Sequence, residues 1–324
     1  RQADGFEAPV YSLLAAEVAY GRAIDAPDAA CGRAFTRVQL GDSLGSRASF
    51  ARLLEADPSD PCALAGASQP TIRFGGSAAG SATLYQDHPS NVAGGAVELG
   101  GWVDIAELAF FGVSGRYLGI GYEDTSIQPY EQGELWLRAG LRHRGFGGQL
   151  LVGVIDRSTA DTPAPVIAGQ VWATFGPTVR LEGSWSEWTD GEASMFGAGI
   201  RVPVLSFLSF DAALNLSSFS DSDDVHPSGS GAVIFDWDPV RLKLGARGGT
   251  EVRPVRFDEA SVWNTTEYLG ASAFLDGTIH LNDNFGLTFG YEVARLEPTD
   301  GSDARHTHVL TFGVTAEGFR ELTP

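Results

Sequence analysis

Apolar residues alternate with small or charged residues, at a period of two, from about residue 70 to the end of the chain. In 285–294, Phe285, Leu287 and Phe289 occupy one set of alternate positions, and Gly286 and Thr288 occupy the other. Successive side chains of a strand point to opposite faces, so this pattern predicts strands with one apolar face. We expect about 14 strands (12 to 16) over residues 71–85, 93–103, 108–121, 134–144, 149–157, 165–175, 178–187, 193–204, 207–217, 230–237, 241–253, 268–281, 285–296 and 306–317.

The lengths of these segments and of their connections indicate a membrane barrel. Globular strands average about five to six residues, whereas a tilted strand needs roughly 9–11 to cross a bilayer. Tight turns such as GFGG, WDPV and LNDN alternate with longer loops such as SFSDSDDVHPSG and VRPVRFDEASVWNTTE. Short turns on one rim and long loops on the other are typical of bacterial outer-membrane proteins. The predicted fold is all-β, a transmembrane antiparallel up-and-down β-barrel with a small α-helical N-terminal segment.

A soluble β-sandwich is the alternative to the barrel, because alternation alone does not say whether the apolar face meets a core or lipid. The second face of the predicted strands is rich in Gly, Ser and Ala, with occasional Arg and Glu. A sandwich exterior would be richer in Lys, Glu, Thr and Gln. A barrel lumen needs small residues and paired charges, so the pattern favours the barrel.

The first 68 residues follow a helical pattern instead. Stretches such as PVYSLLAAEVAYGRAI and GSRASFARLLEADP are rich in Ala, Leu and Arg, with apolar residues three to four apart. Pro58 and Pro61 end the second helix and start another. We therefore divide the chain into a periplasmic helical segment, residues 1–68, and an outer-membrane barrel, residues 69–324.

Two cysteines, Cys31 and Cys62, fall in the helical segment. An even pair in an exported chain predicts a disulfide, with two free buried thiols as the alternative. The chain begins at Arg1 and its only methionine is Met195, which we interpret as removal of a signal peptide from a secreted precursor. A cut made for recombinant expression is the alternative.

Residues 31–66 resemble one tetratricopeptide repeat. Gly41 falls at its inter-helix turn, Phe50 in its second helix, Pro58 at its closing proline, and Ala63 and Gly66 open a next repeat. A plain helical plug or cap is the alternative. With the Gly-rich barrel that follows, the order of parts resembles the YaiO-type outer-membrane barrels, on the stretches ARLLEADPSDPCALAG and HVLTFGV, and more distantly the porins that export exopolysaccharides. The resemblance implies a Gram-negative outer-membrane protein, and the exporters imply passage of a polymer.

The net charge of −19 is concentrated on the predicted long-loop rim. Its 18 acids are Asp87, Glu123, Asp124, Glu131, Asp156, Asp161, Glu187, Asp190, Glu192, Asp221, Asp223, Asp224, Asp258, Glu259, Glu267, Glu297, Asp300 and Asp303. The short turns hold Asp104, Glu107, Asp238 and Asp283. Nucleic acid is excluded as a partner, because no Lys/Arg run offsets this charge. Outer-membrane lipid or lipopolysaccharide is the expected surrounding; we favour a solvated rim over one that binds divalent cations.

Aromatic residues form two predicted girdles, as expected where amphipathic rings meet lipid headgroups. Those beside the short turns are Phe146, Phe175, Phe207, Trp237 and Phe285. Those toward the long loops are Tyr85, Tyr117, Trp185, Trp188, Tyr268 and Tyr291.

The alternation also predicts which charged residues line the lumen. These are Arg138, Arg142, Arg180, Arg201, Lys243, Arg247, Glu134, Glu182, Asp211, Glu251 and Glu292, together with Arg241 and Arg253. They could form the charged rings of a selective pore, or ion pairs that brace a closed barrel; we favour bracing. A pair between Arg247 and Glu292 is not assured, because their predicted strands are not neighbours.

No catalytic residue, cofactor or metal site is predicted. His306 and His308 share one face near Asp303, but no nucleophile motif accompanies them, and a solvated strand end is the preferred interpretation over a metal site. We expect a non-enzymatic conduit for a polymer or small solutes. The alternative is a non-conducting outer-membrane anchor or scaffold, whose helices and loops dock other envelope proteins.

Overall fold

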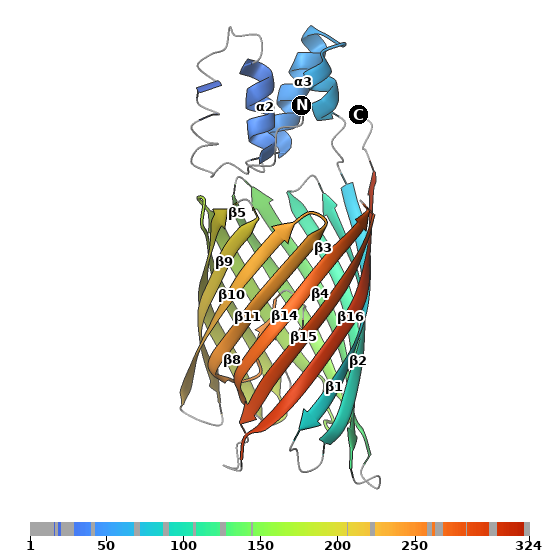
Figure 1. The fold of residues 1–324 in the computed structure, drawn as a ribbon, viewed down its shortest axis with the longest axis vertical. Coiled ribbons are helices and arrows are strands. Elements are labelled where there is room, and N and C mark those ends of the chain that lie inside the picture. Colours follow the sequence, from blue (N-terminus) through green and yellow to red (C-terminus); the bar gives the residue numbers. More distant parts are fainter. Residues whose placement is uncertain are drawn as a thin grey trace.

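The structure, a computed structural model, describes residues 16, 19–20, 29–39, 43–67, 72–86, 91–105, 108–123, 128–143, 145–205, 207–220, 224–257, 261–262, 268–282, 284–297 and 303–320. Within these ranges, three helices precede a long run of antiparallel strands (Figure 1).

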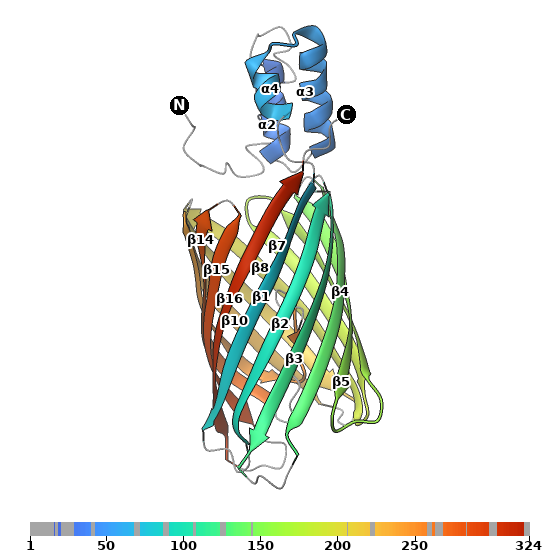
Figure 2. The same ribbon diagram turned by 90° about the vertical axis from the view of Figure 1, so that its right-hand side faces the viewer.

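The strands form one closed antiparallel barrel of 14 strands, which confirms the predicted fold class. They are β1 (Ile72–Gln86), β2 (Asn91–Ile105), β3 (Ala109–Tyr122), β4 (Tyr130–His143), β5 (Phe146–Arg157), β6 (Ala164–Thr174), β7 (Thr178–Trp188), β8 (Gly191–Leu205), β9 (Leu208–Phe219), β10 (Val225–Trp237), β11 (Val240–Glu251), β14 (Tyr268–Asn282), β15 (Phe285–Glu297) and β16 (Arg305–Arg320). Each pairs with its neighbour in the chain, and β1 pairs with β16 to close the barrel (Figure 2). Closure leaves no unpaired edge, which is what a bilayer requires of strands.

The exterior of the barrel is apolar. Leu137 is 58% exposed and Leu214 74% exposed, while their inward-facing neighbours Trp136 and Ala213 are buried. Water does not stabilise such a surface, whereas the hydrocarbon of a bilayer does. The sandwich alternative is therefore wrong, because the apolar faces of these strands point outward.

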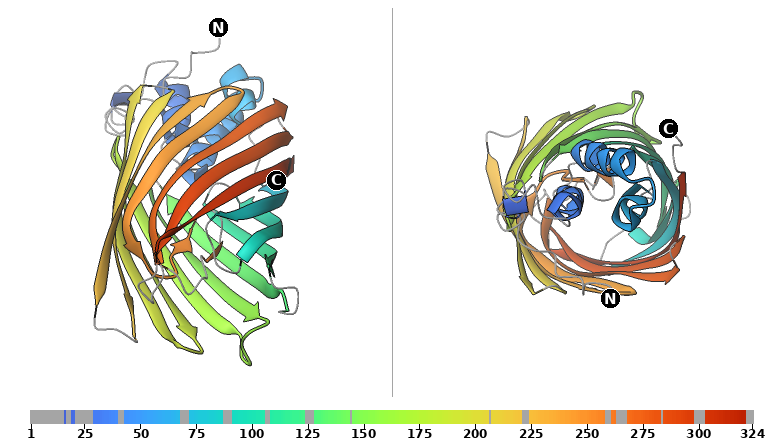
Figure 3. Two further views of the ribbon diagram at one scale, coloured as in Figure 1. Left: turned by 60° about the horizontal axis from the view of Figure 1, so that its bottom comes forward. Right: turned by 90° about the horizontal axis from the view of Figure 1, so that it is seen from above.

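Helices α2 (Ala29–Gln39), α3 (Ser43–Ala56) and α4 (Pro61–Ala67) lie beyond the short-turn rim, at the end where β16 finishes (Figure 1). Seen from above, these blue helices fall within the outline of the barrel (Figure 3). In the described part of the chain, no helix is long and apolar enough to cross a membrane. The predicted helix over 9–24 lies almost entirely outside the described residues.

Local chemistry explains the ends and the packing of these helices. The Asp60 carboxylate accepts a hydrogen bond from the Ala63 amide and so caps α4, while Pro61 occupies its first turn. Phe35 and Phe50 meet edge to face at 5.1 Å, and the Phe50 ring lies so close to Gly66 that a side chain there would clash. The predicted disulfide is present: Cys31 and Cys62 join α2 to α4 with 6.2 Å between their Cα atoms.

Most strands extend beyond their predicted ends. Glu131, Glu192 and Glu297, predicted outside the strands, lie at the ends of β4, β8 and β15 on the long-loop side. Asp104, predicted in a short turn, lies in β2 and forms an ion pair with Arg142.

One strand is shorter than predicted. The segment expected over 241–253 ends at Glu251, after a bulge that Gly249 allows with its positive φ of 98°. Arg253 therefore belongs to a loop and not to the barrel wall, and its φ of 44° is unusual for a residue other than glycine.

Candidate functional site

The segment Val252–Phe257, called here the inner loop, follows β11 and folds into the barrel. All but one of its residues are buried. Its strand β12 (Val255–Arg256) pairs with β13 (Ser261–Val262) inside the wall (Figure 3). The sequence predicts an exposed long loop over 252–267, which is wrong for this part because the inner loop packs against inward-facing side chains.

The packing partners of the inner loop form an apolar cluster inside the lumen. Val255 and Phe257 lie in one cluster with Trp136, Leu151, Ile155, Ala164, Val166, Ala168, Trp188, Ala193 and Met195. These wall residues come from consecutive strands, β4 to β8. Because this cluster excludes water, it fixes the loop in place in the manner of a domain core.

Arg253 anchors the loop to the turn between β7 and β8. Its two terminal nitrogens donate to the two carboxylate oxygens of Asp190, at 2.9 and 2.6 Å. Its guanidinium also lies over the rings of Trp188, at 4.5 Å, and Phe219, at 4.8 Å. The hydrogen bonds from Arg253 lower the pKa of Asp190, so this carboxyl is charged under ordinary conditions.

Two further anchors attach the loop to β15 and β4. Arg256 contacts both carboxylate oxygens of Glu292, at 3.0 and 2.9 Å. Arg138 donates to the backbone carbonyl of Phe257, at 2.5 Å. Four strands, β16, β1, β2 and β3, separate β15 from β4 on the shorter way around the barrel. The loop therefore crosses the lumen instead of following one strand.

A second charged cluster lies on β7, β8 and β9. Arg180 donates to both oxygens of Asp211, at 2.8 and 2.7 Å, and Arg201 donates to the same carboxylate at 3.0 Å. Glu182 lies 3.8 Å from Arg180 and accepts a hydrogen bond from Gln170 at 2.9 Å. Four residues that alternation assigns to the lumen are thus joined in one network.

The Arg247–Glu292 pair forms although β14 separates their strands. The Arg247 nitrogen Nη1 lies 2.9 Å from the Glu292 oxygen Oε1. Inward side chains two strands apart are roughly 10 Å apart at the backbone, a distance that a long arginine can span. Arg247 also lies over the inward-facing Phe274 ring, as does Lys243, at 4.7 and 5.4 Å.

Two predicted lumen acids are buried among uncharged donors. Glu134 accepts hydrogen bonds from Gln132 and Trp136, at 2.8 and 2.9 Å, and Arg116 lies 3.7 Å away. Glu251 accepts one from Ser228 at 2.8 Å. These bonds compensate for burial of the charge, which would otherwise destabilise the barrel strongly.

Apart from Arg253, which belongs to the inner loop, the predicted lumen residues lie on the inner face of the wall, and most are joined in networks. Sequence reasoning missed Arg116, Arg157 and Arg256, and it assigned Trp188 and Tyr85 to a lipid-facing girdle. Trp188 is buried inside, with Arg157 over its ring at 4.7 Å, and Tyr85 shares the inward face of β1 with Thr83. The short-turn girdle is confirmed, since Phe146, Phe175, Phe207, Trp237 and Phe285 are all exposed.

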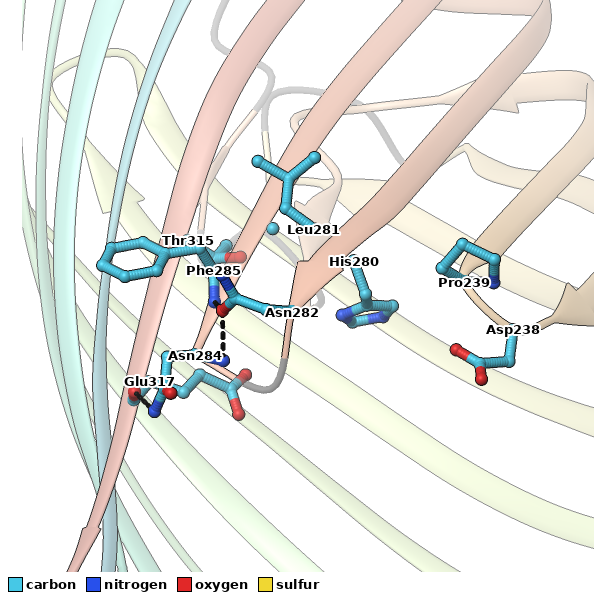
Figure 4. A pocket seen from close by; sticks show the side chains of 10 residues that line it. Asp238, Pro239, His280, Leu281, Asn282, Asn284, Phe285, Thr315 and Glu317 are labelled. Atoms are coloured by element: carbon cyan, nitrogen blue, oxygen red, sulfur yellow. Dashed lines mark hydrogen bonds between the residues drawn. The ribbon is translucent and has the colours of Figure 1, made fainter.

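A cavity of about 320 Å³ lies at the short-turn end, between the β10–β11 turn and β14 to β16 (Figure 4). His280, Asp238 and Glu317 contribute its titratable groups. Asn284 closes one side, where its side chain donates to the Glu317 carbonyl at 2.9 Å. The histidines behind the metal alternative lie elsewhere: His308 contacts Tyr291 at 2.8 Å on the exposed outer face.

No protein-family model matches the chain, and no curated protein matches its sequence. Solved structures do match its fold. A TodX mutant, a monoaromatic hydrocarbon channel, matches with a TM-score of 0.52 and 9% identity, over 81% of this chain and 94% of that one. A bacterial polysaccharide outer membrane secretin matches with a TM-score of 0.47 and 12% identity, over 76% and 98%. OmpF of Salmonella typhi matches with a TM-score of 0.41 and 9% identity, over 77% and 98%.

The match with a TM-score of 0.52 agrees with the closed barrel described above and identifies the fold as that of outer-membrane β-barrels. The resemblance of the chain to YaiO-type proteins and of residues 31–66 to a tetratricopeptide repeat stays a prediction from the sequence, as does the absence of enzymatic activity.

Proposed function

We propose that the chain is a porin-like conduit of the bacterial outer membrane, with a passage narrowed by the inner loop. The apolar exterior supports the location, because only a bilayer accommodates it. The charged inner wall supports the conduit, because arginines and carboxylates surround the space that a solute would cross. The helices beyond the short-turn rim would then lie in the periplasm, where short barrel turns are found.

The observation that carries the proposal is the triple attachment of the inner loop across a polar lumen. Its contacts with Asp190, Glu292 and Arg138 come from three separate parts of the wall. A loop held in this way limits the size of what passes, so it favours small solutes over a polymer. Passage of a polymer would require its displacement.

Single-channel recording in planar bilayers tests the conduit. The purified chain should give steady openings, and Arg256→Ala should raise their conductance or add larger substates, because the loop loses its attachment to β15. Arg295→Ala is the matched control, since Arg295 is an exposed arginine on the outer face of the same strand. A wild-type barrel that stays silent, and remains so with Arg256→Ala, would contradict a conduit.

The second candidate is a non-conducting envelope scaffold. It is favoured by the dry packing of Phe257 and Val255 on the wall, which closes that part of the lumen. In this case the helices or the acidic loops would dock other envelope proteins. A silent barrel that co-purifies with defined envelope proteins, and releases them when the helices are removed, would support the scaffold.

A further inference from the structure

We infer that the passage prefers anionic solutes, although the chain as a whole carries a charge of −19; this inference rests on the proposed conduit. It depends on which partner of each ion pair faces the lumen. Arg241 and Asp236, at the short-turn end, have side chains that are 49% and 65% exposed. In five other pairs inside the barrel, the arginine side chain is more exposed than the carboxylate. The exposures are 43% against 10% for Arg142 and Asp104, 40% against 9% for Arg201 and Asp211, 25% against 0% for Arg116 and Glu134, 22% against 10% for Arg247 and Glu292, and 17% against 10% for Arg256 and Glu292.

The carboxylates lie behind the guanidiniums because other donors hold them against the wall. Glu134 is held by Gln132 and Trp136, and Asp211 by both oxygens through Arg180. At these five pairs, a solute in the lumen therefore meets guanidinium groups before it meets carboxylates. Guanidinium presents several N–H donors in a plane and matches carboxylate and phosphate oxygens, so the exposed surface suits anions.

The order of charges reverses at the long-loop rim. There the Asp190 side chain is 49% exposed, while its partner Arg253 is only 6% exposed. Among the described residues, Glu131, Asp161 and Glu187 are exposed acids at the same end of the barrel. At about 0.1–0.15 M salt, charges act over roughly 8–10 Å, so the acidic mouth does not set the potential deep in the lumen. The part of the lumen lined by exposed arginines therefore decides which ion passes.

The inference is tested by the reversal potential of the full-length chain in a planar bilayer under a KCl gradient. We expect the wild type to favour chloride over potassium. Arg142→Gln and Arg201→Gln should each lower the chloride-to-potassium permeability ratio, by about twofold or more, because each removes a charge exposed to the solute. Arg295→Gln, which removes an arginine that is 54% exposed on the outer face, should leave the ratio unchanged.

Preference for potassium in the wild type, or equal ratios in all four proteins, would overturn the inference while leaving a conduit in place. If the barrel passes no current, the proposed function fails. The inference is then tested by chloride binding to the detergent-solubilised chain, measured as broadening of the chloride NMR line. Broadening by the wild type that falls in the Arg142→Gln Arg201→Gln double variant, but not in Arg295→Gln, supports it. Broadening that is the same in all three proteins overturns it.

Discussion

Arg253 and Asp190 form a doubly hydrogen-bonded pair that joins the inner loop to the turn between β7 and β8. The pair is asymmetric, because Arg253 is buried between aromatic rings while Asp190 remains half exposed. The buried guanidinium depends on its exposed partner for charge compensation, and a charge buried without one is strongly unfavourable. This dependence makes Asp190 the most accessible point at which to loosen the loop.

Asp190→Asn should loosen the inner loop without disrupting the barrel. The variant keeps one acceptor but loses the charge, so we expect a loss of about 1 kcal/mol in loop anchoring, because solvent already screens the exposed carboxylate. Single-channel traces should show more frequent transitions between substates. Asp161→Asn, an exposed long-loop acid, serves as the control. Traces identical to the wild type would show that Asp190 does not restrain the loop.

The same pair predicts an acid-sensitive loop. Arg253 lowers the pKa of Asp190, so the pair contributes its full stabilisation above the ordinary aspartate pKa of about 3.9 and loses it as pH falls through the lower pKa of the folded state. Arg157 and Arg253 both face this carboxylate and both lower its pKa. Substate transitions should therefore be constant from about pH 8 to pH 5 and increase only below about pH 4. A change near neutral pH would contradict this assignment, as would an acid response of equal size in Asp190→Asn.

Phe257→Ala should release the inner loop from the apolar cluster. Phe257 is 6% exposed, and truncation of a buried phenylalanine typically lowers stability by about 3–5 kcal/mol. The inner loop should account for most of this lost stability, because the backbone hydrogen bonds between the barrel strands are unaffected. Conductance should rise, and the fluorescence of the lumenal Trp136 and Trp188 should become more accessible to a water-soluble quencher. Phe235→Ala on the outer face controls for the loss of an aromatic ring, and should change neither property.

The barrel could be predicted from the sequence because its signal is local. Each strand carries its own period of two, and the same alternation assigns residues such as Arg180 and Asp211 to one face. The same alternation also gives the correct side for Trp188. Trp185 and Trp188 are three residues apart on one strand, so their side chains must point to opposite faces of the wall. The girdle prediction considered only their height along the strand.

The inner loop could not be predicted in this way. Its sequence, VRPVRF, has no period that separates an exposed loop from a buried one. Burial of Val255 and Phe257 depends on side chains of β4 to β8, which are distant in the chain and meet only after the barrel closes. Arg256 finds Glu292 on β15 for the same reason, so the three anchors are a property of the closed fold.

Loss of the Cys31–Cys62 disulfide should unfold the helical segment while leaving the barrel intact. The bond closes a chain segment of 31 residues, which corresponds to about 3–4 kcal/mol of stabilisation in the chain-entropy model. Few residues are buried around Phe50, so a core this small should not hold three helices together without the bond. The double variant Cys31→Ser Cys62→Ser should therefore lose its helical circular dichroism signal and become sensitive to protease before residue 72. Its β-strand circular dichroism and the shift in gel mobility on heating, which reports a folded barrel, should be unchanged. Reduction of the wild type should reproduce this result. A variant that keeps its helical signal would show that contact with the barrel, and not the disulfide, holds the helices.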